Sequence, residues 1–278
     1  MRALFSVGVA LAVAGGGCAG VAGAAPASPE ATPLTAIEAC PASSAGGVPI
    51  LLIHGTNATV EKSLGPVQQA LLEDGRCVYG LEFNSMQPLS ASVDYFAGAV
   101  DRIREVNHVT AIDVVGKSQG ALIARAVSVR SADGATPPLR HVVAISGPQH
   151  GVSQTVAGVD ITPIGARTPL FNLIDRAAMR DMLVGSPFMT ELGRGPMTAP
   201  GVHYTMLASR YDQIVTPYSN AFVDEPNVKN ILIQDGCEED RAGHLAESTD
   251  PRTVDLVLNA LDPVRHPVVR CVPNTDER

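Results

Sequence analysis

Ser118 is the residue with the clearest setting for chemistry. It lies at the centre of GKSQG, residues 116–120, which fits the pattern G-x-S-x-G. A β-like run precedes this motif and a helix-like run follows it. A sharp strand-to-helix turn needs small residues on both sides of the serine, because larger side chains would clash with the backbone, and it lifts the hydroxyl above the sheet. We therefore predict that Ser118 is a nucleophile; the alternative is an ordinary turn with a helix-capping serine.

Two backbone N–H groups are candidates for stabilising the oxyanion that a serine nucleophile would create. The sequence His54-Gly55-Thr56 ends the first expected core strand. In this architecture the residue after His-Gly can donate its N–H together with the residue after the nucleophile. We expect the N–H groups of Thr56 and Gln119 to form the oxyanion hole. The side chain of His54 is expected to buttress the loop by hydrogen bonding.

Three histidines are candidates for the general base: His150, His203 and His244. The acid and then the base follow the serine along the chain in this architecture. His244 lies in a loop just past the last expected strand, which suits a base. His150 comes before any suitable acid, and His203 opens a strand and so lies at the wrong end of the sheet. We predict His244 as the base.

Two aspartates are candidates for the acid that would orient this base. Asp212 lies just past the strand expected at 203–209, and Asp235 ends the strand expected at 228–234. The acid should hang from the end of the strand before the base, which favours Asp212. Asp235 remains the rival, and the alternative for Asp212 is a solvated turn aspartate.

The elements that must position these residues alternate along the chain. Nearly continuous apolar runs are typical of strands buried on both faces, and apolar residues at three- and four-residue spacing indicate helices. Such alternation implies right-handed crossovers and an α/β fold, a mostly parallel central sheet flanked by helices. The expected strands are 48–54, 77–83, 110–115, 141–146, 203–209 and 228–234, and the expected helices are 64–72, 93–106, one from 122 to 129, and 251–261.

The segment between Ser146 and His203 is longer than an ordinary connection. It is apolar and rich in methionine, whose flexible side chains adapt to irregular ligands. One interpretation is a small cap or lid insertion within 150–202 over an acyl-binding pocket. The other is one more helix packed on the sheet.

The N-terminal residues carry the pattern of a targeting segment. Arg2 is followed by a short apolar stretch, and Ala22-Gly23-Ala24 offers a cleavage site, so residues 1–24 are predicted to be a secretory signal peptide. The alternative is a lipoprotein anchored at Cys18. Residues 25–39 are expected to be a flexible mature terminus, and residues 40–278 a single domain.

Four cysteines remain after Cys18, an even number that favours two disulfides in an exported chain. Three pairings are open. We favour Cys40–Cys77, which would tie the N-terminal segment to the second strand, and Cys237–Cys271, which would close a loop carrying the candidate base. Free buried thiols are the alternative. Metal ligation is disfavoured, because no C-x-x-C motif or close Cys/His spacing occurs.

Composition limits the class of partner. The chain has 278 residues with a net charge of −8, and its basic residues are scattered, which argues against a surface that binds nucleic acid. Aromatic residues are 4% of the chain and tryptophan is absent, which argues against base-stacking platforms. Beyond the N-terminus no stretch approaches the apolar length of a membrane helix, so no permanent membrane span is expected.

The motifs together resemble a known family. The stretches IHGTNA, VVGKSQGALIAR, SGPQHG, SRYDQIVTP and ILIQDGC followed by GHL are similar to the secreted bacterial class 2 lipases of the α/β-hydrolase superfamily and, more distantly, to the fungal enzyme lipase B. The resemblance covers the chain from about Cys40 to the C-terminus. It implies Ser118, Asp212 and His244 as the triad and an oxyanion hole from Thr56 and Gln119, and it supports the disulfide pairing favoured above. Lys117 departs from the family, which often has histidine or an aromatic residue there, and a long cation beside the nucleophile could narrow or polarise the pocket.

These observations predict a secreted serine carboxylester hydrolase, a lipase or esterase that acts through an acyl-enzyme without metal or organic cofactor. Its partner would be an ester or lipid substrate. If the chain has a lid, we expect it to act on that substrate at a lipid–water interface. Another serine acyl chemistry on the same triad, acyl transfer or thioester cleavage, is a second hypothesis. A non-catalytic secreted binding protein is a third, disfavoured because every expected catalytic residue type is present.

Overall fold

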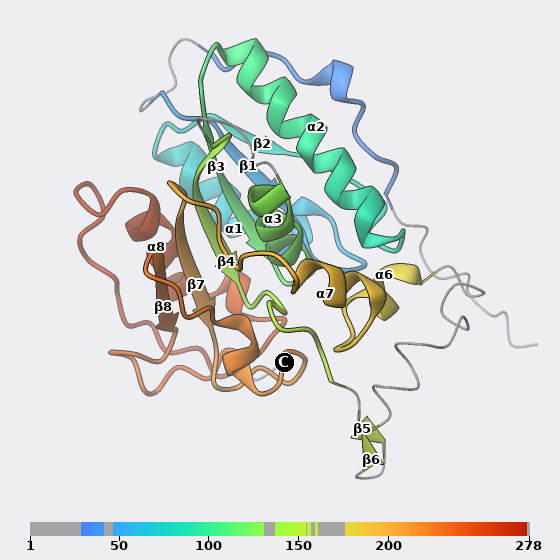
Figure 1. Ribbon diagram of the computed structural model, residues 1–278. Coiled ribbons are helices and arrows are strands. Elements are labelled where there is room, and N and C mark those ends of the chain that lie inside the picture. The colour runs from blue at the N-terminus through green and yellow to red at the C-terminus, as the bar shows by residue number, and fades with distance from the viewer. Residues whose placement is uncertain are drawn as a thin grey trace, which may run out of the picture.

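A six-stranded sheet, in which every neighbouring pair of strands is parallel, forms the centre of the computed structural model (Figure 1). The strand order is β2-β1-β3-β4-β7-β8. The strands are β1 (Ile50–Ile53), β2 (Val78–Gly80), β3 (Ile112–Lys117), β4 (Leu139–Ile145), β7 (His203–Ala208) and β8 (Val228–Leu232). The structure describes residues 29–41, 47–130, 137–153, 155–156, 159–160 and 176–276.

Helices cover both faces of this sheet, so the molecule has three layers (Figure 1). Successive side chains of a strand point to opposite faces. In β1, Leu51 and Ile53 therefore join the core under α2 and α3, whereas Ile50 and Leu52 join the core under α1 and α8. Burial on both sides explains the continuous apolar run of the sequence. The helices are α1 (Val60–Glu73), α2 (Leu89–Asn107), α3 (Gln119–Arg130) and α8 (Pro251–Leu261).

The six strands and four long helices expected from the sequence are all present, with shifts of a few residues at their ends. The largest shifts are at α1 and α2, which begin at Val60 and Leu89, each four residues before the expected start. The side chain of Thr59 accepts a hydrogen bond from the N–H of Lys62 at 3.2 Å and so caps the start of α1. The fold is that of an α/β hydrolase, as the sequence predicted.

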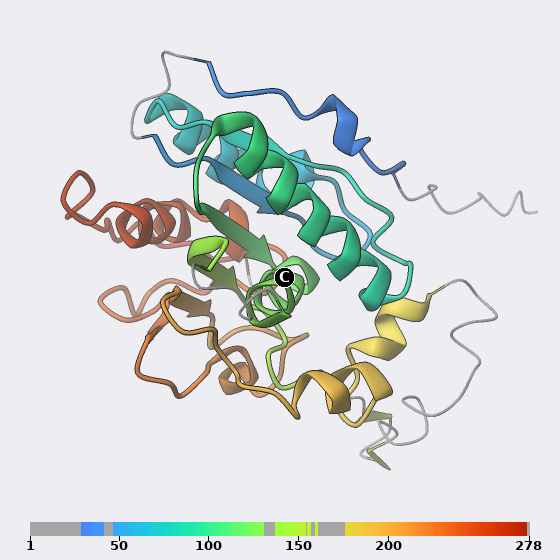
Figure 2. The ribbon, with the colours of Figure 1, turned by 45° about the horizontal axis from the view of Figure 1, so that its top comes forward.

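The region expected to hold a cap lies beside the carboxyl ends of the strands (Figures 1 and 2). Its described strands and helices are the hairpin of β5 (Thr155–Val156) and β6 (Val159–Asp160) and the short helices α6 (Ala177–Asp181) and α7 (Pro187–Leu192). A side-chain oxygen of Asp181 accepts a hydrogen bond from the N–H of Leu89 at 3.0 Å, which ties α6 to the start of α2. Residues 154, 157–158 and 161–175 of the expected cap lie outside the described residues.

The N-terminal segment is described from residue 29, so the expected signal peptide and Cys18 lie outside the described residues. Within the segment expected to be a flexible terminus, the N–H of Thr32 donates to Glu82 O at 2.9 Å, and Ile37 is buried in the core. These two contacts show that the described part of the N-terminal segment packs against the rest of the domain. No helix within the described ranges is long and apolar enough to cross a membrane.

Two disulfides fix the ends of the domain. One joins Cys40 to Cys77, just before β2, and the other joins Cys237 to Cys271. This is the pairing favoured from the sequence. Disulfides are typical of proteins that fold in an oxidising compartment.

Candidate active site

The turn that carries Ser118 has the strained geometry of a nucleophile elbow. Ser118 follows β3 and precedes α3, and its φ is 54°, in the left-handed region that side-chain-bearing residues rarely adopt. A Cβ at Gly116 would lie 2.5 Å from Gly120 O, and one at Gly120 would lie 2.0 Å from Ile53 O. Both motif glycines are therefore required by close backbone packing, which is the steric reason that the sequence pattern suggested.

The hydroxyl of Ser118 lies in a hydrogen-bonded chain with an imidazole and a carboxylate. His244 Nε2 is 3.0 Å from Ser118 Oγ, and His244 Nδ1 is 2.7 Å from Asp212 Oδ2. The three side chains come from loops that follow β3, β7 and β8, and parallel strands bring their carboxyl ends to one edge of the sheet. The three residues, far apart in sequence, are thus close enough for proton transfer between serine and imidazole.

Asp212 is held as a carboxylate although it is buried. Burial raises its pKa, but the hydrogen bond and charge of His244 and the N–H groups of Val215 and Ile214 outweigh burial, so that the pKa of Asp212 lies below its ordinary value. The two N–H groups donate to Oδ1 at 2.8 Å each. One oxygen is therefore fixed by backbone, which leaves the other free to orient the imidazole.

The other candidates for the acid and the base, Asp235, His150 and His203, lie away from Ser118. The side chain of Asp235 is 58% exposed, and one of its oxygens accepts the N–H of Leu232 at 3.3 Å. His150 is exposed and its Nε2 lies 2.9 Å from Phe222 O. His203 is exposed at the first position of β7, at the opposite end of the strand from the site. The structure brings Asp212 and His244, and none of these three, to Ser118.

The two residues expected to supply the oxyanion hole are joined to each other. The hydroxyl of Thr56 donates to Gln119 Oε1 at 2.7 Å, and Gln119 Nε2 donates to Ser85 O at 2.9 Å. Thr56 follows β1 and Gln119 begins α3, so both lie at the serine. Within the described part of the chain, neither backbone N–H makes a hydrogen bond to another protein atom, which leaves both able to bind an oxyanion.

The side chain of His54 supports this loop from inside the core. It is fully buried, its Nδ1 donates to Gly55 O at 2.8 Å, and its ring packs against Phe83. Burial lowers the pKa of His54, against the opposing influence of the Gly55 hydrogen bond and the charge of Glu82. A buried imidazole with these contacts holds the loop in place and does not face Ser118.

A cavity of about 340 Å³ opens above the serine. Apolar side chains form much of its wall, and some of them come from the region expected to be a cap. Leu245 and Ile214 are 67% and 45% exposed at this cavity, although both are large and apolar. Such a cavity suits a hydrophobic chain attached to a carbonyl carbon. Its apolar wall includes Pro148, Val152, Met179, Met182, Ile214, Val215 and Leu245.

A buried ion pair beneath the triad was not foreseen from the sequence. The ammonium of Lys117 does not reach across the cavity but bonds Glu247, whose side chain is fully buried. The hydroxyl of Ser146 donates to the other carboxylate oxygen at 2.5 Å. Lys117 is 4% exposed and is among the residues that line the cavity, but its charge is paired with Glu247. A lysine inside a buried strand needs a partner, which is the one sequence signal that could have prompted a search for Glu247.

The carboxylates near His244 also have a spacing that could suit a cation. Ligand atoms of Asp212, His244 and Glu247 lie within 4.8 Å of one another. The ammonium of Lys117 already neutralises Glu247, however, and both imidazole nitrogens are engaged by the serine and by Asp212. The donor set therefore fits a proton-transfer chain better than a metal centre.

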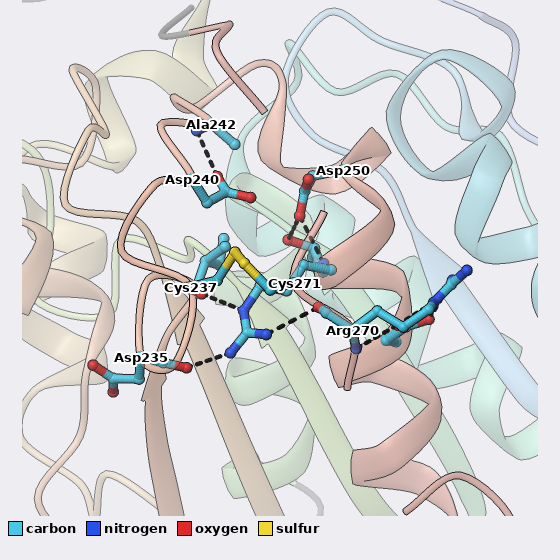
Figure 3. Close-up of a disulfide and its surroundings, with 11 residues drawn as sticks. Asp235, Cys237, Asp240, Ala242, Asp250, Arg270 and Cys271 are labelled. Carbon is cyan, nitrogen blue, oxygen red and sulfur yellow. Dashed lines mark hydrogen bonds and ion pairs between the residues drawn. A yellow bond between two sulfur atoms is a disulfide. The ribbon is translucent and has the colours of Figure 1, made fainter. Parts of the chain in front are cut away.

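The loop that carries His244 is anchored at its base by the second disulfide (Figure 3). The guanidinium of Arg252 donates to Ile233 O, to Asp235 O and, at 3.0 Å, to Arg270 O. Three carbonyl groups from the end of β8 and the C-terminal segment are thus gathered by one side chain. The disulfide and the hydrogen bonds of Arg252 fix the base of the loop, and they thereby help to hold the imidazole of His244 in position.

Comparison with known families agrees with this geometry. A family model described as palmitoyl protein thioesterase matches residues 49–191, just over half of the chain, including the serine turn. The chain belongs to the palmitoyl protein thioesterase family. The family match and the fold together place this chain among the α/β hydrolases. No curated protein matches the chain in sequence.

Solved structures share the fold of this member of the palmitoyl protein thioesterase family. Lipase B from Aspergillus fumigatus is 21% identical with a TM-score of 0.63, and the alignment covers 86% of this chain and 62% of that lipase. The mature lipase BlEst2 from Bacillus licheniformis is 14% identical with a TM-score of 0.55, covering 82% and 94%. An esterase from Exiguobacterium antarcticum is 13% identical with a TM-score of 0.52, covering 78% and 93%. At these identities the likeness concerns the fold.

Proposed function

We propose that this protein is a secreted serine hydrolase that cleaves acyl esters through an acyl-enzyme. The observation that carries the proposal is the hydrogen-bonded chain from Ser118 Oγ through His244 to Asp212, with distances of 3.0 and 2.7 Å. Nucleophile, base and orienting acid stand in the order that nucleophilic catalysis by serine requires.

The reaction begins when His244 Nε2 takes the proton of Ser118 as Oγ attacks the carbonyl carbon. Asp212 holds the imidazole through Nδ1 and stabilises the imidazolium. The tetrahedral intermediate places its oxyanion at the N–H groups of Thr56 and Gln119, and one such donor typically contributes about 3 kcal/mol to catalysis by a serine hydrolase. The imidazolium then protonates the leaving alkoxide, and water releases the acid from the acyl-enzyme by the same route.

The cavity supports an acyl chain as the recognised part of the substrate. Its methionine-containing wall can adapt to a flexible hydrocarbon. The exposed Leu245 and Ile214 extend this apolar surface to the solvent, which suits a hydrophobic substrate that arrives from an aggregate or a lipid surface. The resemblance of the sequence motifs to class 2 lipases also supports a substrate that carries an acyl chain.

Secretion is part of the proposal. The two disulfides favour an oxidising compartment, and the pattern of residues 1–24 is that of a signal peptide. We propose that the mature protein is one hydrolase domain, against which residues 29–39 also pack, and that Val152, Met179 and Met182 belong to a small cap at the cavity.

Thioester cleavage is a second candidate, favoured by the match to the palmitoyl protein thioesterase family. The same serine, base and oxyanion donors would act, and a thiolate would leave in place of an alkoxide. A thiolate needs less help from protonation, so the two substrate classes would differ in how strongly they depend on His244 as an acid.

The test compares hydrolysis of p-nitrophenyl butyrate, p-nitrophenyl palmitate and palmitoyl-coenzyme A by the wild type. Ser118→Ala should lower kcat/KM by roughly 10³-fold or more on every accepted substrate, whereas the exposed Ser90→Ala should leave it unchanged. Equal rates for wild type and Ser118→Ala would overturn the proposal. A higher kcat/KM for the thioester than for both esters would make thioester cleavage the activity.

A further inference from the structure

Glu247 is a carboxylate that the proposed reaction does not use, although it lies beside the proposed base. Its Oε1 is 3.7 Å from His244 Nδ1, the same nitrogen that bonds Asp212 at 2.7 Å. The side chain is fully buried in the 3₁₀ helix η3 (Glu247–Thr249), three residues after the base. One imidazole nitrogen therefore faces two carboxylates, one in direct contact and one behind it.

The pKa of Glu247 lies above its ordinary value. Burial is the largest cause and raises it, and the negative charge of Asp212 acts in the same direction. The positive charge and hydrogen bond of Lys117, together with the charge of His244, lower this pKa. Lys117 and Ser146 each donate a hydrogen bond to one oxygen of Glu247. Two such donors stabilise the ionised form of a carboxylate.

The donors come from elements that also carry the catalytic residues. Lys117 is the last residue of β3, next to the nucleophile, and Ser146 follows β4. Ser146 is held at a φ of 42°, in the left-handed region, and from there its hydroxyl reaches Glu247 at 2.5 Å. A buried ion pair adds little to stability compared with an apolar pair of similar size. A strained residue and an ion pair that converge behind the base point to a role in the site.

On the premise that the proposed triad is correct, we propose that Glu247 is a positioning residue, a second carboxylate anchored by Lys117 and Ser146 that stabilises the imidazolium form of His244 together with Asp212. Lys117 then acts as the counter-charge of this carboxylate and not as a group that binds substrate. Because Glu247 is close to His244 Nδ1, it also gives partial support when Asp212 is lost.

The sign of the effect follows from the charges. A negative charge near the imidazole stabilises the protonated form relative to the neutral form, and the loss of that charge acts in the opposite direction. In Glu247→Gln the negative charge is lost while the ammonium of Lys117 stays. The acid limb of the rate profile should therefore move to lower pH, and the maximal rate should fall by roughly 10-fold, because the proton is taken up less readily in the transition state.

The experiment measures labelling of Ser118 by a fluorophosphonate over pH 4–9. The Ser118 Oγ–P bond forms, fluoride leaves and the serine proton passes to His244, so the reading depends on the nucleophile and base but not on the acyl substrate. The variants are the wild type, Glu247→Gln and Lys117→Met/Glu247→Gln. The double variant replaces the ion pair by neutral groups of similar size, which guards against a failure to fold.

We expect the acid limb to move to lower pH in Glu247→Gln and to move less, in the same direction, in the double variant. We also expect Asp212→Asn/Glu247→Gln to be labelled more slowly than Asp212→Asn. Slower labelling with an unmoved acid limb in every folded variant would mean a purely structural role and would overturn the inference. A wild type that is not labelled at Ser118 would instead overturn the proposed function, so the two failures can be told apart.

Discussion

The hydroxyl of Thr56 donates a hydrogen bond to Gln119 Oε1 at 2.7 Å, so the two residues whose backbone N–H groups are proposed to bind the oxyanion are held together by their side chains. The amide of Gln119 continues the chain to Ser85 O, and the hydroxyl of Ser85 accepts the N–H of Asn57 at 2.8 Å. The loops after β1 and β2 are thereby fixed to the start of α3. An oxyanion hole lowers a barrier only if its donors are already aimed when the charge develops, which these bonds achieve.

The first prediction concerns the hydroxyl of Thr56. Thr56→Val keeps the shape of the side chain but leaves Gln119 Oε1 without its donor, so the N–H at position 56 loses alignment. We expect kcat to fall roughly 10-fold with little change in KM, less than the loss of a whole oxyanion donor. Steady-state kinetics on the best ester measures this effect. Thr56→Ser keeps the hydroxyl and should stay close to the wild type; equal losses in the two variants would contradict the prediction.

The second prediction separates the two candidate acids. Asp212→Asn should lower kcat by roughly 10³-fold, because the imidazole loses the carboxylate that orients it and stabilises its charge. Asp235→Asn, a matched change at a residue whose side chain is 58% exposed, should leave kcat unchanged. A large loss in Asp235→Asn with an active Asp212→Asn would reverse the assignment.

The same aspartate makes a prediction for acid stability. Its pKa in the folded protein lies below the ordinary 3.8, because the hydrogen bond and charge of His244 and two backbone N–H groups outweigh burial, which raises it. Its contribution to the free energy of unfolding is therefore complete above pH 3.8 and is lost as the pH falls through the lower folded-state pKa. Urea unfolding of the wild type and Asp212→Asn should show a stability difference that shrinks below pH 4. A difference that stays constant over this range would contradict the assignment of the shift.

The sequence was sufficient to predict the sheet, because its strands are buried on both faces and their apolar runs stand out from the surrounding pattern. It was also sufficient to place Ser118, because the glycines of the turn are required by backbone packing. The start of α1 was placed late, since Gly65 and Pro66 interrupt the helical pattern after its true first turn. The cap Thr59 is the signal that defines this turn.

The contact between Lys117 and Glu247 could not be predicted by the same reasoning. The two residues are 130 positions apart, and no local periodicity relates them. Their pairing depends on how the loop after β8 returns over the end of β3, which is a property of the assembled sheet. Lys117 was consequently interpreted by its neighbour in sequence, the nucleophile, and assigned to the pocket, whereas its ammonium is directed to a buried partner in the protein interior.

The last prediction concerns two buried aspartates in the loop that carries the proposed base. Asp240 and Asp250 are both fully buried, and one oxygen of each, Asp240 Oδ2 and Asp250 Oδ1, has no hydrogen-bond partner in the described part of the chain, so we expect a proton held by Asp250 to bridge the two carboxyl groups. Burial raises the pKa of Asp250 to about 6, with the charge of Asp240 acting in the same direction. The pair therefore stabilises the fold in full below pH 3.8, and this contribution is lost as the pH rises through about 6.

Asp240→Asn should remove this loss. The variant keeps an oxygen to accept the N–H of Ala242, which lies 2.8 Å from Asp240 Oδ1, and its new N–H group can donate to Asp250 without a shared proton. We expect about 1 kcal/mol of added stability at pH 8, a rise in Tm of roughly 2–4 °C, and a smaller gain at pH 4.5. Thermal unfolding at the two pH values measures this, with the exposed Asp235→Asn as control. A gain that is equal at both pH values, or a loss at pH 8, would show that the aspartates do not share a proton. The expected pH dependence arises because the pair binds a proton in the folded state at a pH where both carboxyl groups of the unfolded chain are ionised.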